Sequence, residues 1–145
     1  RVSLHGRTGA AMRTAVEPHA LLDTGNAPAL QFPLYFTSSG EFSLSLQLSP
    51  SLPFDAATGI QLAIALDDKL LGTVSLPEQS DKKAWEQGVL NNVKTLTSTL
   101  PVAKPGRYTL TVYGLTPGAV LQKVVVDTGD LKSSYLGPLE RRYKL

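Results

Sequence analysis

The sequence predicts an all-β protein, an antiparallel β-sandwich or jelly roll with one short helix. The first observation is an alternation of apolar and polar residues with period two, which is clearest in Glu41–Leu48, Gly59–Leu66 and Gly106–Tyr113. Such alternation is typical of strands with one face on a core and the other in water. The second observation is the regular spacing of compact turn signals, including Asp67-Asp68-Lys69 and Lys104-Pro105-Gly106. Seven or eight short strands separated in this way favour a two-layered sandwich.

The N-terminal region is the least regular part of the pattern. The first 28 residues contain two weak strand signals, around Val2–Leu4 and Ala11–Val16. A clearer strand is predicted at Ala29–Thr37. Because Pro33 has no N–H to donate to a neighbouring strand, we expect this strand to lie at a sheet edge or to carry a bulge.

The central and C-terminal regions carry the stronger strand patterns. In Glu41–Leu48 the apolar residues all fall on one face, and Ser43, Ser45 and Gln47 fall on the other. We expect the strand aromatics to pack in the core or across strands; they are Tyr35, Phe36, Tyr108 and Tyr113. The strands predicted after Ala29–Thr37 are Glu41–Leu48, Gly59–Leu66, Leu70–Leu76, Val93–Leu100, Gly106–Tyr113 and Ala119–Val126.

One short helix is predicted, at Asp81–Leu90. Ser80 stands where an N-cap residue would accept hydrogen bonds from the first turn. Gly88 lies inside the segment and lowers its helix propensity, so we expect one or two turns only.

Length and charge exclude several classes of function. The 145 residues and 15.5 kDa match one domain, with residues 1–28 the least regular part and 139–145 a tail. The net charge is +2, and Glu140, Arg141, Arg142 and Lys144 in the tail account for all of it. The rest of the chain is formally neutral, which argues against a nucleic-acid surface because such surfaces gather several cations on one face.

The chain offers neither a membrane helix nor cysteine chemistry. No apolar run approaches the roughly 20 residues that span a bilayer. There is no cysteine for a disulfide, a thiolate metal site or a nucleophile. The chain opens on Arg1, which we interpret as the start of a piece of a longer protein, so the lack of a signal peptide does not argue against export.

Catalytic and metal motifs are weak. His5 and His19 have no partners at ligand or triad spacing, and neither a G-x-S-x-G elbow nor a glycine-rich phosphate loop occurs. Asp67-Asp68 is interpreted as a hairpin turn rather than a pair of hydrolytic carboxylates. The segment from Asp127 to Asp130 is preferred as a turn over a calcium site, since calcium takes six to eight oxygens. We therefore expect no catalytic residue, no metal ligand and no cofactor.

Trp85 is the only tryptophan, and it stands among charged and polar residues rather than in a strand. An aromatic face in polar company can stack on the apolar face of a sugar ring. Packing of Trp85 against one end of the sandwich core is the alternative. For a carbohydrate site, Trp85 and Tyr135 would stack, and nearby amides would donate and accept hydrogen bonds with hydroxyls; these amides belong to Gln87, Asn91 and Asn92.

From Leu30 onward, five blocks of sequence resemble the C-terminal domain of glycoside hydrolase family 115, the family of xylan α-1,2-glucuronidases. Tyr108 stands where the pattern usually has histidine, Leu139 where it usually has a second proline, and the first 28 residues match poorly. The blocks are Leu48–Phe54, Ile64–Asp68, Ala84–Val93 with its single tryptophan, Pro117–Asp127, and Ser134-Tyr135-Leu136-Gly137-Pro138.

The resemblance implies a β-sandwich accessory domain of a large, multi-domain, carbohydrate-active enzyme. The catalytic apparatus of that family lies in other domains, so no catalytic residue transfers to this chain. The implied partners are a plant polysaccharide such as xylan or glucuronoxylan and the other domains of the parent enzyme. The implied location is secreted or periplasmic in a bacterium. The alternative is a structural or dimerisation domain with no glycan affinity of its own.

Overall fold

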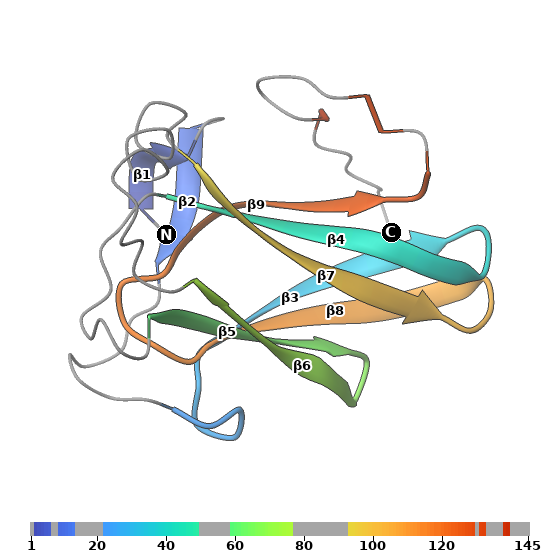
Figure 1. Cartoon of the computed structure of the whole chain (residues 1–145), viewed down its shortest axis with the longest axis horizontal. Coiled ribbons are helices and arrows are strands. Elements are labelled where there is room, and N and C mark those ends of the chain that lie inside the picture. Colours follow the sequence, from blue (N-terminus) through green and yellow to red (C-terminus); the bar gives the residue numbers. More distant parts are fainter. Residues whose placement is uncertain are drawn as a thin grey trace.

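The computed structural model describes residues 2–6, 9–13, 22–49, 59–76, 93–129, 131–132 and 138–139, and these residues form two packed antiparallel sheets (Figure 1). The five-stranded sheet has the order β1-β2-β9-β4-β7, and the four-stranded sheet has the order β3-β8-β5-β6. The predicted all-β sandwich is confirmed. The strands are β1 (Val2–Gly6), β2 (Gly9–Arg13), β3 (Ala29–Phe36), β4 (Gly40–Leu48), β5 (Ile60–Leu66), β6 (Lys69–Leu76), β7 (Lys94–Val102), β8 (Gly106–Gly114) and β9 (Val120–Asp127).

Every strand predicted from alternation is present, with boundaries shifted by one or two residues. The two weak N-terminal signals also form strands, β1 and β2. Strand β3 is at the edge of its sheet, as Pro33 requires, and pairs only with β8 among the described strands. The predicted helix at Asp81–Leu90 lies outside the described residues, and no helix that could cross a membrane occurs within them.

The core lies between the sheets and is built from the apolar faces of the alternating strands. Strand β4 contributes Phe42 and three fully buried leucines, and Leu110 and Val112 of β8 lie among the buried residues of the facing sheet. Full burial of one such side chain stabilises the fold by about 1.5–3 kcal/mol. The side chains with the least exposure are Leu44, Leu46, Leu48, Ile60, Ile64, Leu100 and Leu110.

Strand β5 departs from the expected half-exposed pattern. Ala63 and Ala65 alternate with the core residues of this strand, but they are only 1% and 4% exposed. Strand β5 is an interior strand, and Ala63 lies between Tyr113 of β8 and Thr73 of β6. A short alanine side chain between larger neighbours is shielded from water. The expectation that one face of β5 is exposed to solvent is therefore wrong.

Three turns meet at one end of the sandwich, which we call the turn end (Figure 1). They are residues 37–39 between β3 and β4, residues 67–68 between β5 and β6, and residues 103–105 between β7 and β8. The turn end is joined by aromatic packing: the rings of Phe36 and Phe42 stack at 5.1 Å, and Tyr108 meets Phe36 edge-on at 5.7 Å. The Tyr108 hydroxyl also donates to the carbonyl of Lys104 at 2.9 Å.

Two strand aromatics behave differently from each other at this end. Phe36 is buried as expected, whereas Tyr35 is 62% exposed although it lies opposite Arg107. The alternation of β3 turns Tyr35 to the outer face of its sheet. Of the two placements expected for Tyr35, the core or packing across strands, the structure excludes the core.

The opposite end, which we call the loop end, carries residues 115–119 between β8 and β9. Here the Gln61 N–H donates to the Thr116 hydroxyl at 2.8 Å, and the Leu115 N–H donates to the Gln61 carbonyl at 3.1 Å. The Ser49 N–H donates to the Val120 carbonyl at 2.9 Å. These bonds fix the start of β5 and the end of β4 against the segment that enters β9.

Candidate functional site

The predicted sugar-contacting residues lie outside the part of the chain that the structure describes. They are Trp85, Gln87, Asn91, Asn92 and Tyr135. The strands that flank the first four of them are described: β6 ends at Leu76 and β7 begins at Lys94. Leu76 pairs with Ile60 and Lys94 with Leu48, so both strand termini are at the loop end.

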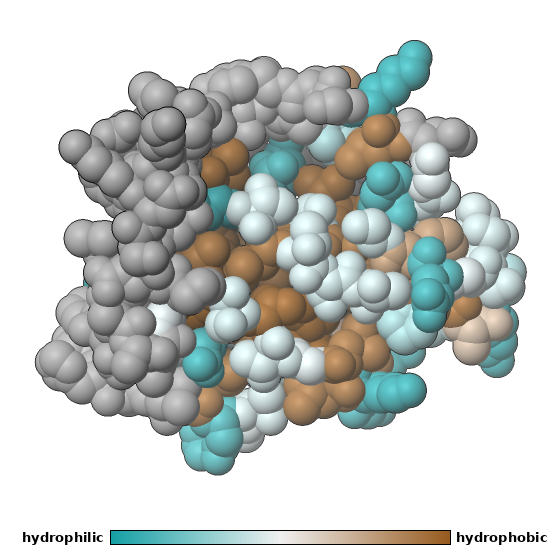
Figure 2. All heavy atoms as spheres, in the orientation of Figure 1, coloured by the Kyte–Doolittle hydropathy of each residue, from teal (hydrophilic) through white to brown (hydrophobic). Residues whose placement is uncertain are grey.

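The outer face of β4 and β7 is polar and carries no aromatic side chain. Thr95, Thr97 and Thr99 of β7 are exposed and lie opposite Gln47, Ser45 and Ser43 of β4, respectively. Figure 2 shows pale, weakly polar side chains across the middle of this side of the molecule, with hydrophobic atoms visible between them and strongly hydrophilic atoms mainly around the margin. A stacking platform for a sugar is therefore not provided by these two strands.

A depression of about 760 Å³ opens at the turn end. Its lining comes from the start of β4, the β5–β6 hairpin, the end of β7 and Tyr108 of β8. The lining includes buried and half-buried apolar side chains, among them Leu66, Leu71 and Val102. Ligand sites in proteins commonly have an apolar lining with a few polar groups, and the lining of this open depression has that composition.

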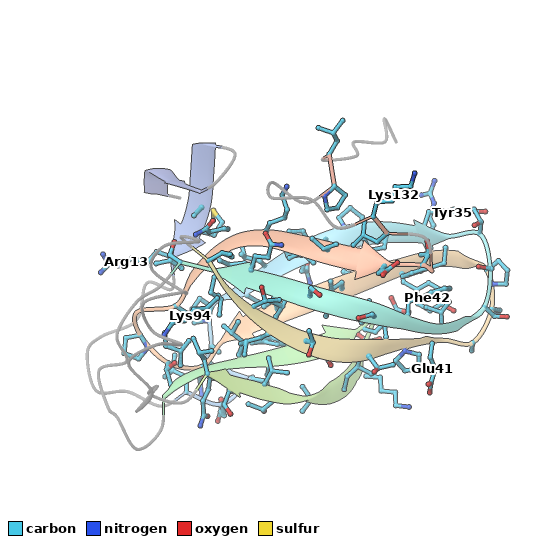
Figure 3. The ribbon with its side chains drawn as sticks, turned by 45° about the horizontal axis from the view of Figure 1, so that its top comes forward. Arg13, Tyr35, Glu41, Phe42, Lys94 and Lys132 are labelled. Atoms are coloured by element: carbon cyan, nitrogen blue, oxygen red, sulfur yellow. The ribbon has the colours of Figure 1, made fainter. Side chains whose placement is uncertain are left out.

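The exposed side chains around this depression are mostly acidic. Glu41, Asp67, Asp68 and Lys69 give three negative charges and one positive, a formal total of −2. Glu41 comes from the five-stranded sheet and projects away from it beside the end of β7 (Figure 3). Two sheets thus contribute charged groups to one opening.

Asp67 has a structural role within this group. Its backbone has φ 52°, in the left-handed region that aspartate tolerates better than most residues. The Thr109 N–H donates to Asp67 Oδ1 at 2.7 Å, and the Asp67 N–H donates to the Thr109 carbonyl at 2.7 Å. The interpretation of Asp67-Asp68 as a hairpin turn is confirmed, and the turn is held against β8.

The second acidic motif is also a turn where it is described. The Gly129 N–H donates to Asp127 Oδ1 at 2.8 Å, which closes a short turn after β9. Asp130 lies outside the described residues. Within the described part of the chain, no three histidine, aspartate or glutamate side chains gather as they would around a metal ion.

The depression at the turn end is not among the sites predicted from the sequence. Its residues belong to separate turns and strand ends of the sequence, and none carries a motif. The available signal was the direction of the strands: successive antiparallel strands return to the same end, which brings the turns at 38–40, 67–69 and 104–106 together.

Solved structures place the fold among modules of carbohydrate-active enzymes. The chain resembles the C-terminal carbohydrate-binding module of family 6 from LamC, a marine laminarinase of Zobellia galactanivorans, with TM-score 0.51 and 21% identity over 71% of this chain and 74% of that one. It also resembles a family 35 module, Xyl-CBM35, in complex with a disaccharide containing glucuronic acid, with TM-score 0.51 and 16% identity over 83% and 88% of the two chains. At these identities the similarity shows the fold alone.

A larger enzyme contains a similar domain. BtGH115A, a family 115 4-O-methyl-α-glucuronidase with specificity for decorated arabinogalactans, matches with TM-score 0.64 and 19% identity. The match covers 72% of this chain and 14% of that enzyme, so the chain corresponds to a small part of it. No curated protein matches the sequence.

The family model of the glycosyl hydrolase family 115 C-terminal domain matches residues 1–140, and the chain belongs to this family. The match begins at residue 1, so the expectation that the first 28 residues fit the family poorly is wrong. Within the described residues, β1 and β2 of the N-terminal region form part of the five-stranded sheet, through the pairing of β2 with β9.

Proposed function

We propose that this chain is a non-catalytic, carbohydrate-binding domain of a family 115 glycoside hydrolase, a xylan α-1,2-glucuronidase. The observation that carries the proposal is the match to a family 35 carbohydrate-binding module, which covers 83% of this chain and 88% of that module. The proposed ligand is a plant polysaccharide such as xylan or glucuronoxylan. That family 35 module is in complex with a disaccharide containing glucuronic acid, which supports this class of ligand.

The proposed binding residues are Trp85 and Tyr135 as stacking platforms, with Gln87, Asn91 and Asn92 as hydrogen-bonding groups. The described strands support this proposal in two ways. The outer face of β4 and β7 has no aromatic side chain, so on this side of the molecule a stacking platform would have to come from connecting segments. The segment that carries Trp85 joins β6 to β7, whose adjoining termini are fixed at the loop end by pairing with Ile60 and Leu48.

Binding through one aromatic platform is weak, but it raises the local concentration of the enzyme on the polymer. A domain tethered to a catalytic domain makes the second encounter with the polymer intramolecular, which raises overall avidity without any new contact. Weak binding therefore suits an accessory domain whose parent enzyme acts repeatedly along one polymer.

Affinity gel electrophoresis and calorimetry against soluble xylans and glucuronoxylan test the proposal. The wild-type chain should be retarded in glycan-containing gels, and Trp85→Ala should weaken the retardation. Tyr35→Ala removes an exposed ring from strand β3 and is the matched control, since it should migrate like the wild type. Unchanged migration of the wild type in every glycan would refute the proposal, and turnover of a chromogenic glycoside would refute the non-catalytic role.

A structural role is the second candidate, and one observation favours it. Tyr35 and Leu70 are exposed by 62% and 52%, and both lie in the four-stranded sheet. In BtGH115A the matched region is only 14% of the chain, so a related enzyme has ample surface to cover such residues. A docking domain should self-associate or bind its parent enzyme, and light scattering that shows a monomer with glycan affinity would exclude this candidate.

A further inference from the structure

The depression at the turn end combines an apolar lining with exposed carboxylates that the turns do not use for their own hydrogen bonds. Its volume of about 760 Å³ lies between the end of β7 and the β5–β6 hairpin, and it is lined by both sheets. Asp67 already closes the hairpin through its bonds with Thr109. The side chains of Glu41 and Asp68 are exposed, and neither carboxylate forms a hydrogen bond with another described residue.

We propose that this depression is a second glycan-binding site, specific for a neutral pyranose, at the opposite end of the domain from the strand termini that flank the segment carrying Trp85. The proposal rests on the carbohydrate-binding function proposed above and adds a site and a ligand class to it. Glu41 and Asp68 accept hydrogen bonds from sugar hydroxyls, and Lys69 donates one. The apolar lining, which includes Leu71 and Tyr108, receives the C–H face of the ring.

The apolar side chains of the lining match the C–H surface of a sugar ring, and its carboxylates match the hydroxyl groups at the border of the ring. A pyranose has one surface of C–H groups and a border of hydroxyls, and each carboxylate can accept hydrogen bonds from two neighbouring hydroxyls. Hydrogen bonds to an ionised acceptor are roughly twice as strong as those between neutral groups. The two acceptors come from different elements, Glu41 from β4 and Asp68 from the hairpin, so a ligand that bridges them contacts both sheets.

Charge decides which sugar is accepted. The opening has a formal charge of −2 from Glu41, Asp67, Asp68 and Lys69. A uronic acid would bring its own carboxylate next to these groups and be repelled. A neutral sugar has no such cost, so the site should discriminate the unsubstituted backbone of a glucuronoxylan from its acidic branches.

Amide chemical-shift mapping by NMR on the complete chain tests this proposal, with a neutral xylo-oligosaccharide as the probe. The amides of Glu41, Asp68, Lys69 and Val102 should shift, and they should still shift in Trp85→Ala. The double variant Glu41→Gln with Asp68→Asn keeps the shape of both side chains and should weaken this binding about tenfold. Asp127→Asn is the control, because it removes a carboxylate charge elsewhere and keeps the oxygen that Gly129 uses.

The outcomes separate the two proposals. Shifts only at residues away from the depression, or shifts there that the double variant leaves unchanged, would overturn the second site and leave carbohydrate binding standing. A lack of shifts with every glycan would overturn both. Shifts in the depression with a diamine such as putrescine, but not with the neutral sugar, would make it a cation site and overturn the sugar assignment. A uronic acid that binds there as well as the neutral sugar would refute the charge argument.

Discussion

Asp67 allows a test of how the turn end is stabilised, because this residue adopts a left-handed backbone angle and its side chain also accepts a hydrogen bond. It sits at φ 52°, and its Oδ1 accepts the Thr109 N–H at 2.7 Å. Asp67→Ala removes the acceptor, at about 1 kcal/mol, and places a Cβ without a compensating polar group in the left-handed region, at about 1 kcal/mol more. We therefore expect Asp67→Ala to lower the free energy of unfolding by about 2 kcal/mol.

Two companion variants separate the contributions. Asp67→Gly loses the acceptor but adopts the backbone angle freely, so the loss should be about 1 kcal/mol. Asp67→Asn keeps an oxygen at the same place and tolerates the same angle, so the loss should be below about 0.5 kcal/mol. Urea unfolding followed by circular dichroism gives all three values. Equal stability of the alanine and asparagine variants would refute the reasoning.

Two further predictions concern the core and the loop end. Leu100→Ala should lower the free energy of unfolding by about 2–5 kcal/mol, because Leu100 is fully buried. Leu139→Ala, at a position that is 92% exposed, should change the free energy of unfolding by less than about 0.5 kcal/mol. Similar values for the two variants would contradict the assigned core. Thr116→Val should cost about 1–3 kcal/mol, because the Gln61 N–H loses its acceptor, and Thr116→Ser should recover most of that loss. Denaturant unfolding measures both pairs, and a stable Thr116→Val with a destabilised serine variant would show that the methyl group, not the hydroxyl, matters.

Much of the fold could be predicted from the sequence because the signal is local and redundant. In β4 each second residue is a large apolar one, and the buried face of the strand is that set. Pro33 marked an edge strand for a reason that does not depend on context, since proline lacks the N–H that an interior strand needs. Chain order and turn chemistry then left few arrangements other than a sandwich.

Other features depend on neighbours that the sequence does not reveal. Ala63 and Ala65 look like the wet face of β5, but their exposure is set by the side chains that β6 and β8 place beside them. The depression is a sum of three turns and has no motif of its own. Asp67 was recognisable as a turn residue, whereas its bond to Thr109, 42 positions away, is a product of the fold.

The division of the connections between the two ends has a consequence for how such domains can diversify. At one end, tight turns set the strand pairing, and β4 and β7 keep an unbroken register over their whole length. At the other end, residues 49–59 and 77–93 span between strand termini that are already secured. Lengthening a connection between fixed strand ends carries a low entropic cost. These two segments can therefore be replaced by other sequences while the strands are kept. A library of such replacements could change what the domain binds without changes to its two sheets.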